Sequence, residues 1–307
     1  MRTEIIIQLV LYHDAHYLEG LLSSLKAQTF KYFRVFAWDN SSDDQSAQRF
    51  KELYPDGHLI KSDKNLGFSG GHNALLKQTL EEGADYVLIL NTDVQIHKDF
   101  LKQLHNQMTR FRGVDACGPL IYEGLAGKRT SKVQYFRLYM DFIKARKSSP
   151  DSGKVLNTSK ELPVSADVDY LAGVALMVRT EVFNEMFLWD EDLFLYGEER
   201  DFFYRFRKQR RLAMVTRKAI CWHFHDWSVG NSKSYQREYY YLRRNKILYF
   251  KKYRLKRGMV CFLLSEIFKL PVSAVWTIRK GGIRMFYLYW LGIWHGIRGI
   301  KGRNDHL

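Results

Sequence analysis

Cysteine and proline are scarce in this chain of 307 residues. The 3 cysteines, Cys117, Cys221 and Cys261, are far apart, odd in number and outside any metal-binding spacing. Such usage argues against a disulfide framework and favours a reducing compartment. The amino terminus enters an apolar run at residues 5–11 without the basic, apolar and small-residue order of a signal peptide. With 5 prolines and 46% hydrophobic residues, the composition predicts a cytoplasmic globular protein with little linker.

The chain also lacks a long hydrophobic run. A helix that crosses a bilayer needs about 20 apolar residues, whereas the longest runs near the carboxyl terminus are residues 259–265 and 285–294. Trp276, Trp290 and Trp294 occur there beside lysine and arginine, which is typical of helices that lie on an anionic membrane surface. A helical subdomain that packs on the core or forms a homodimer is the alternative interpretation.

Acidic residues are nearly absent from residues 201–257, which contain 17 Lys or Arg against 3 Asp or Glu in a chain of net charge +15. A basic block of this kind predicts an anionic partner: nucleic acid, a membrane surface or a phosphate-bearing substrate. Aromatic residues interleave with it, as at residues 239–245, and single-stranded nucleic-acid binders share that composition. A non-catalytic binder of an anionic polymer is therefore an open alternative to an enzyme.

The most informative stretch that the chain does contain is residues 86–94. Four apolar residues, 87–90, predict a strand buried on both faces of a mostly parallel sheet. Asn91, Thr92 and Asp93 follow, which places a carboxylate at the crevice where open α/β sheets bind ligands. Mg²⁺ or Mn²⁺ bound to such a carboxylate can hold a diphosphate. A strand that simply ends in an Asx-turn is the alternative.

Strand and helix patterns alternate along the first third of the chain. The predicted elements are a strand at 5–11, a helix carrying Leu18, Leu21, Leu22 and Leu25, a strand at 33–38, a helix from about 45, a strand at 58–61 and a helix at 74–82. This order predicts a doubly wound, mostly parallel sheet with helices on both faces. Asp39 and Asp93 would then lie on the same rim of the sheet, each at the carboxyl end of its strand.

A glycine-rich segment at residues 65–73 precedes the third predicted helix. Gly67, Gly70 and Gly71 match neither the dinucleotide-binding fingerprint nor the P-loop pattern. They serve either a tight turn or a close approach of the backbone to a nucleotide sugar, with Asn65 and Asn73 as nearby hydrogen-bonding groups.

Two further clusters carry titratable side chains. Glu198, Glu199 and Asp201 open a predicted amphipathic helix, where acidic residues are favoured by the helix dipole alone. The functional interpretation is a general base on a rigid helix. A predicted loop at residues 222–226 follows, in which the alternating His223 and His225 could supply a metal ligand.

These segments resemble one family closely, because residues 39–43, 65–73, 91–93, 173–179 and 196–201 occur in the order seen in inverting family 2 glycosyltransferases of the A-type (GT-A) fold. The resemblance runs from the amino terminus to about residue 230. Residues 237–245 and 292–302 are similar to the bacterial rhamnosyltransferase branch.

The resemblance implies an α/β GT-A catalytic domain over residues 1–230, and a helical, basic and aromatic region over residues 231–307 that associates with membrane or dimerises. It implies inverting transfer of a sugar, with rhamnose favoured, from a dTDP- or UDP-sugar to a lipid-linked glycan or polysaccharide acceptor. The enzyme would be peripheral on the inner face of the cell membrane, and nucleic acid is not the expected partner.

The resemblance also implies residue roles. Asp39 would recognise the base, and Asp93 would bind Mg²⁺ or Mn²⁺ with the donor diphosphate, with Asn91 in place of a first carboxylate. Glu199 would be the catalytic base, with Glu198 as the alternative. The metal site would be completed by His223 or His225. The proposed nucleotide-sugar contacts are Asp39, Asn40, Asn65, Gly67, Phe68, Asn73, Asn91, Thr92 and Asp93. The matched segments and the helix that follows them add Gly173, Asp201 and Arg205 as further site candidates.

Overall fold

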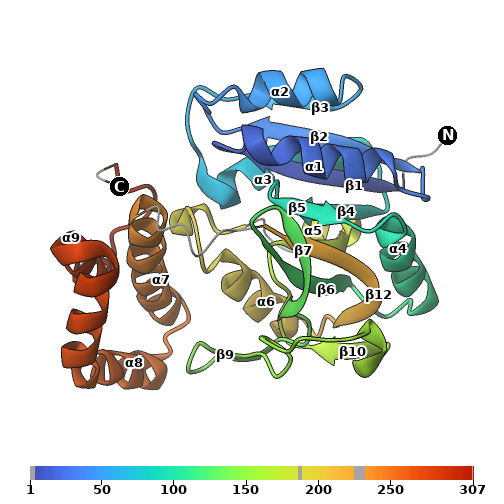
Figure 1. Cartoon of the computed structure of the whole chain (residues 1–307). Helices are drawn as coiled ribbons and strands as arrows, with labels where there is room; N and C mark the ends of the chain where they lie inside the picture. Colours follow the sequence, from blue (N-terminus) through green and yellow to red (C-terminus); the bar gives the residue numbers. More distant parts are fainter. Residues whose placement is uncertain (1–3, 186–188, 225–231, 306) are drawn as a thin grey trace.

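The computed structural model describes residues 4–185, 189–224, 232–305 and 307, which form an α/β domain followed by a group of helices (Figure 1). The strands of the domain are β1 (Ile5–Leu11), β2 (Phe33–Asp39), β3 (His58–Lys61), β4 (Tyr86–Leu90), β5 (Val94–Ile96), β6 (Ala116–Leu125), β7 (Lys128–Tyr135), β8 (Tyr139–Asp141), β9 (Arg146–Ser148), β10 (Ser165–Val168), β11 (Ala175–Arg179) and β12 (Ala213–His223). The helices are α1 (Ala15–Lys26), α2 (Ser46–Leu53), α3 (Gly67–Glu81), α4 (Phe100–Arg110), η1 (Ser159–Glu161), α5 (Thr180–Glu185), η2 (Glu191–Leu193), α6 (Glu198–Lys208), α7 (Ser232–Lys252), α8 (Lys256–Phe268) and α9 (Leu270–Arg298).

The main sheet is mixed, with the strand order β10-β12-β6-β11-β4-β1-β2-β3. The block β3-β2-β1-β4 is parallel throughout, whereas β11 is antiparallel to both β4 and β6. The predicted strands at 5–11, 33–38 and 58–61 are confirmed, and so is the doubly wound α/β class. The carboxyl ends of β1, β2 and β4 therefore meet at one edge of the sheet.

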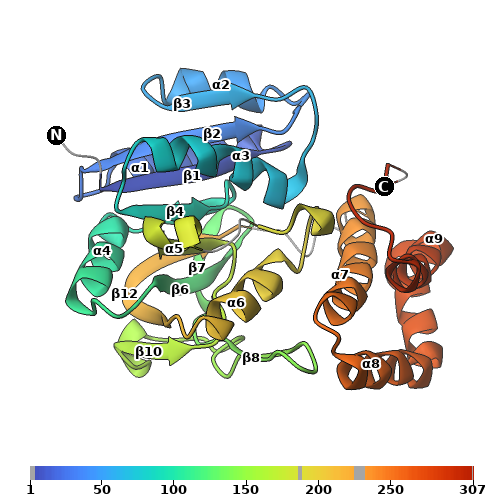
Figure 2. The same ribbon diagram turned by 180° about the vertical axis from the view of Figure 1, so that it is seen from behind.

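Apolar side chains on the two faces of the sheet form separate cores. The predicted leucines Leu18, Leu21, Leu22 and Leu25 of α1 are buried with α4 against one face. On the other face the phenylalanines of α6 pack with α5, Val87 and Ile89, and Leu75 of α3 packs beside Ile6. Figure 2 shows α3, α5 and α6 on this second face.

The structure corrects two element boundaries. The helix predicted from residue 74 begins at Gly67, so the glycine-rich segment is the first part of α3 rather than a turn before it. Gly71 is needed there because a Cβ would lie 2.9 Å from Cγ2 of Val10, so glycine allows the helix to pack closely on the sheet. His223 lies in a strand and not in a loop, because β12 pairs with β5 up to the register His223–Val94.

The carboxyl-terminal helices α7, α8 and α9 lie together beside the edge toward which β1 runs (Figure 1). Tyr240 and Tyr241 of α7 pack on Leu288 of α9. Within the described ranges, no helix taken alone has the length and hydropathy required to cross a membrane. The pair α8 and residues 270–276 meets those criteria together, with a bend of 63° between its members.

Candidate active site

A pocket of about 200 Å³ lies at the carboxyl ends of the parallel strands. It brings together most of the nucleotide-sugar residues predicted from the sequence. Those that line it are Asn40, Asn65, Gly67, Phe68, Asn91, Thr92 and Asp93. They come from the ends of β2 and β4 and from the start of α3, so the strand order explains why residues distant in sequence converge here.

Asn40 and Asn65 shape the loop that enters α3. The Asn40 amide donates to the Gly67 carbonyl at 2.9 Å, and its oxygen accepts from the Leu66 N–H at 2.9 Å. The Asn65 side chain accepts from the Gly67 N–H at 2.8 Å. Gly67 has φ +72°, and a Cβ there would clash with the Phe194 carbonyl. Glycine is therefore required at this position by both conformation and space.

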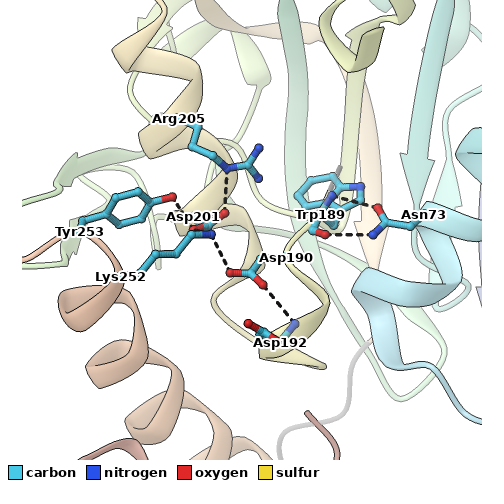
Figure 3. A network of polar contacts seen from close by, with 8 residues as sticks. All are labelled: Asn73, Trp189, Asp190, Asp192, Asp201, Arg205, Lys252 and Tyr253. Carbon is cyan, nitrogen blue, oxygen red and sulfur yellow. Dashed lines mark hydrogen bonds and ion pairs between the residues drawn. The ribbon is translucent and has the colours of Figure 1, made fainter. Parts of the chain in front are cut away.

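Asp39 and Asn73 are the two predicted contacts that do not line the pocket. Asp39 ends β2 and is buried, its carboxylate accepts from the Ser42 N–H at 3.2 Å, and burial raises its pKa. The Asn73 amide is occupied by main-chain groups: it donates to the Trp189 carbonyl at 2.9 Å and accepts from the Trp189 N–H at 2.9 Å (Figure 3). Asn73 therefore anchors the segment before η2.

Asp14 lines the same pocket and was not singled out by the sequence analysis. It follows β1, and its carboxylate accepts from the Tyr12 N–H at 2.9 Å. Burial, opposed in part by hydrogen bonds from Tyr12 and Thr92, raises its pKa to about 7. A signal for it was present, because a carboxylate just after a predicted parallel strand belongs on the same rim as Asp39 and Asp93.

Asp93 and His223 lie in direct contact, with 3.1 Å between Asp93 Oδ2 and His223 Nε2. The other ring nitrogen, Nδ1, is 2.8 Å from Gln134 Oε1 on β7. The Phe224 N–H donates to the Asp93 carbonyl at 2.8 Å. The second histidine of the prediction, His225, lies outside the described residues.

The Asp93–His223 pair has donor atoms that suit a divalent cation. With Nδ1–H donating to Gln134, the neutral imidazole presents the Nε2 lone pair to the carboxylate, and two such acceptors need a proton or a metal ion between them. Imidazole and carboxylate together are compatible with Mn²⁺, and the carboxylate with Mg²⁺. Among the described residues, no group of three or more His, Cys, Asp or Glu could hold a metal ion. A diphosphate would therefore supply further ligands.

Glu198 and Glu199 form the first turn of α6 and differ in environment. Glu199 Oε1 accepts from the Gly173 N–H at 3.1 Å, and a Cβ on Gly173 would lie 2.6 Å from that oxygen. Glycine at 173 thus permits the approach. Glu198 is 3% exposed, and burial, followed by the negative charge of Glu199, holds its pKa well above the usual range.

Strand β7 contributes Gln134 to the surroundings of the Asp93–His223 pair. The next residue on this strand is Tyr135, and burial, followed by the charge of Glu199, raises the pKa of Tyr135 to about 12.

Asp201 and Arg205 belong to a different network (Figure 3). Asp201 is 1% exposed and accepts from Arg205 Nε at 2.9 Å, from Lys252 Nζ at 2.6 Å and from the Tyr253 hydroxyl at 2.6 Å. These contacts join α6 to the end of α7. Neither Asp201 nor Arg205 lines the pocket at Asp93.

A mixed α/β sheet with a pocket at the edge of its parallel strands, lined by Asp14 and Asp93 among others, agrees with the GT-A fold expected from the sequence. Residues 7–187, more than half of the chain, match the family model described as glycosyl transferase family 2. The chain therefore belongs to glycosyl transferase family 2, and it is a glycosyltransferase.

Two curated relatives align over much of the chain. An N-acetylglucosaminyl-diphospho-decaprenol L-rhamnosyltransferase of Mycobacterium tuberculosis is 27% identical over 234 residues, which are 72% of this chain and 76% of the relative. A low-salt glycan biosynthesis hexosyltransferase of Haloferax volcanii is 28% identical over 181 residues, 56% of this chain and 52% of the relative. The chain thus spans about half of the second protein.

Solved structures with the same fold include proteins in complex with nucleotides or nucleotide sugars. A mannosyltransferase from Pyrobaculum calidifontis in complex with GDP-Man and Mn²⁺ superposes with a TM-score of 0.59 at 14% identity, over 97% of this chain and 81% of that one. TarS 1-349 of S. aureus in complex with UDP-GlcNAc gives 0.58 at 15% identity, with the same coverage. GalNAc-T7 with UDP, GalNAc and Mn²⁺ also gives 0.58, at 13% identity, but the chain spans only 50% of it. These similarities show the fold.

Proposed function

We propose that the protein is an inverting, metal-dependent glycosyltransferase. It moves a sugar, with rhamnose favoured, from a dTDP- or UDP-sugar to a lipid-linked glycan or polysaccharide. The observation that carries this proposal is the Asp93 carboxylate in the pocket, with His223 Nε2 3.1 Å from it. The similarity to the mycobacterial rhamnosyltransferase, which acts on an N-acetylglucosaminyl-diphospho-decaprenol, supports the choice of rhamnose and of a lipid diphosphate acceptor.

Glu199 is the proposed base. It is less buried than Glu198. The hydrogen bond from the Gly173 N–H orients its Oε1 atom, and its Oε2 atom would receive the proton of the acceptor hydroxyl. Glu199 takes the hydroxyl proton, and the acceptor oxygen displaces the nucleoside diphosphate from the anomeric carbon with inversion. Asp93 and His223 would hold Mg²⁺ or Mn²⁺, which neutralises charge on the leaving diphosphate.

Arg237 is the proposed protein cation at the diphosphate. It comes from α7 and lines the pocket together with Asp93 and Thr92. A guanidinium can bind phosphate oxygens through two parallel hydrogen bonds. Its origin in α7 means that the region after residue 231 contributes directly to the proposed donor site.

The proposed location is the cytoplasmic membrane face, with α8 and α9 in contact with lipid. Ile267, Phe268 and Val272 are 60%, 83% and 72% exposed around the α8–α9 bend. Residues 267–304 contain 7 Lys or Arg and no acidic residue. Exposed apolar residues with purely cationic neighbours suit an anionic bilayer. We therefore retain residues 1–230 as the catalytic domain and 231–307 as the membrane-associating region, with dimerisation as the alternative.

The decisive experiment is an assay with purified protein, a panel of dTDP-, UDP- and GDP-sugars, and a short-chain lipid diphosphate N-acetylglucosamine acceptor. We expect turnover of dTDP-rhamnose that stops when EDTA is added and resumes with Mn²⁺ or Mg²⁺, and an inverted anomer by NMR. Retention of configuration would exclude the single displacement. Failure to transfer or hydrolyse any donor, with or without metal, would refute the proposed activity.

A further inference from the structure

Residues 193–197 connect the proposed donor pocket to the proposed base. Phe194 and Leu195 line the pocket, and the Phe194 carbonyl accepts from the Phe68 N–H at 2.9 Å. Gly197 directly precedes α6, whose first turn carries Glu199. A displacement of this short segment would therefore move a wall of the pocket and the base together.

The backbone of this segment is unusual. Phe194 and Tyr196 have φ of 63° and 65°, and Gly197 has φ of 96°. Residues other than glycine rarely adopt this left-handed conformation, because their Cβ atom crowds the backbone. Such conformations persist only where the surrounding structure fixes them, and they are frequent at functional sites. Contacts that fix residues 193–197 are therefore expected.

Asn245 of α7 supplies these contacts. Its Nδ2 lies within hydrogen-bond distance of three carbonyl oxygens of the segment, at 2.9 Å from Leu193, 2.8 Å from Leu195 and 2.6 Å from Tyr196, and these carbonyls share its two N–H groups. Asn245 is 1% exposed, so its own NH₂ group is shielded from water. A carboxamide is well suited here because its NH₂ group only donates.

Arg244 completes the arrangement. Its Nη2 donates to the Leu193 carbonyl at 2.9 Å, and its Nε donates to Asn245 Oδ1 at 2.9 Å, which aims the Asn245 NH₂ group at the segment. Its Nη1 donates to the Gly302 carbonyl at 2.5 Å. A fully buried guanidinium is tolerated only when its donors are satisfied, and this one satisfies them on the segment and on the chain after α9.

We propose that Arg244 and Asn245 are positioning residues that hold residues 193–197 so that the pocket wall and Glu199 are correctly placed. The carboxyl-terminal helices are then part of the catalytic machinery as well as a means of reaching the membrane. This inference rests on the proposed function for the identity of the base. The clamp, by which we mean the hydrogen bonds from Arg244 and Asn245 to residues 193–197, is a property of the fold.

The test compares Asn245→Ala, which removes all three contacts, with Asn245→Ser, which retains one donor. Arg243→Ala is the matched control, because this neighbouring arginine on α7 lies over the rings of Tyr239 and Tyr289, at 4.6 and 4.1 Å, and not on the segment. Hydrogen–deuterium exchange of a peptide spanning residues 190–200, Tm, kcat and the donor KM are measured on each full-length variant.

We expect Asn245→Ala to accelerate exchange in this peptide and to lower kcat by about 10- to 100-fold per folded molecule, since a displacement of about 1 Å can cost 10²-fold. The donor KM should change less than kcat, because Asn40, Asn65 and Gly67 remain in place. Asn245→Ser should lie between Asn245→Ala and wild type, and Arg243→Ala should leave exchange and kcat unchanged.

The exchange measurement needs no substrate. It therefore shows whether Asn245 holds residues 193–197 in place even if no donor is turned over and the proposed function is wrong. Wild-type exchange and kcat in Asn245→Ala would overturn the inference. A loss of kcat that merely follows the loss of folded protein would also overturn it, because the role would then be structural. Should Asn245→Ala not fold, Asn245→Ser decides by the same criteria.

Discussion

The strand β4 and the bend between α8 and α9 differ in the exposure of their apolar side chains, which are buried in β4 and exposed at the bend. The side chains at 87–90 in β4 are 0% exposed. In contrast, Phe268 at the bend is 83% exposed, and Ile283 further along α9 is 75% exposed. Burying apolar surface is the main favourable term in folding. The α/β domain therefore buries these side chains in its own core, while the carboxyl-terminal region leaves apolar surface exposed to solvent, as the proposed membrane contact requires.

This contrast suggests a division of labour that is incomplete in one respect. In the proposed function, chemistry is concentrated at the edge of the parallel strands, and lipid contact in α8 and α9. Yet α7 supplies Arg237 to the pocket and Asn245 to the segment before the base. Variants of the proposed metal ligand and base in the α/β domain should strongly reduce transfer to every acceptor, and variants at the bend should affect only membrane binding. Variants in α7 should distinguish a strict division from a shared site.

The largest effect is expected for Asp93→Ala. Removal of a charged ligand should lower kcat/KM by ~10³-fold or more, because the diphosphate charge is no longer neutralised. Transfer to a soluble acceptor at saturating Mn²⁺ measures it. Asp63→Ala, which removes an exposed carboxylate between β3 and α3, is the control and should be neutral. A near wild-type rate in Asp93→Ala would remove Asp93 from the site.

The next effect separates the two glutamates of α6. Glu199→Gln should bind donor normally while kcat falls by ~10²–10⁴-fold, the range for a lost general base. Glu198→Gln should change kcat little, because burial and the negative charge of Glu199 raise the pKa of Glu198 and so favour its neutral form, which Gln resembles. Donor affinity by calorimetry and kcat are the measurements. The opposite pattern would exchange the two roles, and no loss in either variant would make the cluster only a helix start.

Arg237→Ala tests whether the site is shared between the two regions. We expect the donor KM to rise by about tenfold, the scale of one charge-assisted hydrogen bond, with partial recovery in Arg237→Lys. Affinity for nucleoside diphosphate should fall more than affinity for the nucleoside, because the guanidinium is assigned to phosphate. Equal affinities of wild type and Arg237→Ala for the diphosphate would restrict the donor site to the α/β domain.

Phe268→Glu tests the other side of the comparison. We expect sedimentation with anionic vesicles to fall several-fold, because a charge replaces an exposed apolar side chain that would enter the interface. Transfer to a soluble acceptor should not change. Salt should weaken the binding of wild type, given a screening length of about 8 Å at physiological ionic strength. Leu212→Glu, at a residue 55% exposed on the α/β domain, is the control. A change from dimer to monomer without any vesicle binding would assign the surface to a second copy.

The sequence predicted the alternating strands and helices because their periodicity is local. It missed the start of α3, since glycine is a poor helix former and its place is set by contact with Val10. It brought Asp93 and His223 together only through the family resemblance, because 130 positions separate them. The roles of Asn73 and Asn245 depend on main-chain carbonyls far away in the sequence, which no motif encodes.

The smallest expected effect concerns the pH dependence of stability and is confined to the α/β domain. Burial disfavours the charge of Asp14 and raises its pKa to about 7 in the folded protein, from the ordinary value of 3.8. Between these two values the folded state binds more protons than the unfolded state, so Asp14 makes stability fall as pH rises toward 7. Asp14→Asn should therefore raise Tm by about 2–5 °C at pH 8 and change it little at pH 4. Thermal unfolding in EDTA measures this, since a cation at the neighbouring Asp93 would lower the pKa of Asp14.

Asp99→Asn, at a carboxyl that precedes α4 outside the pocket, should show no such pH-dependent gain. An equal Tm change at both pH values would mean that Asp14 ionises as in the unfolded chain and that the pocket imposes no electrostatic penalty on it.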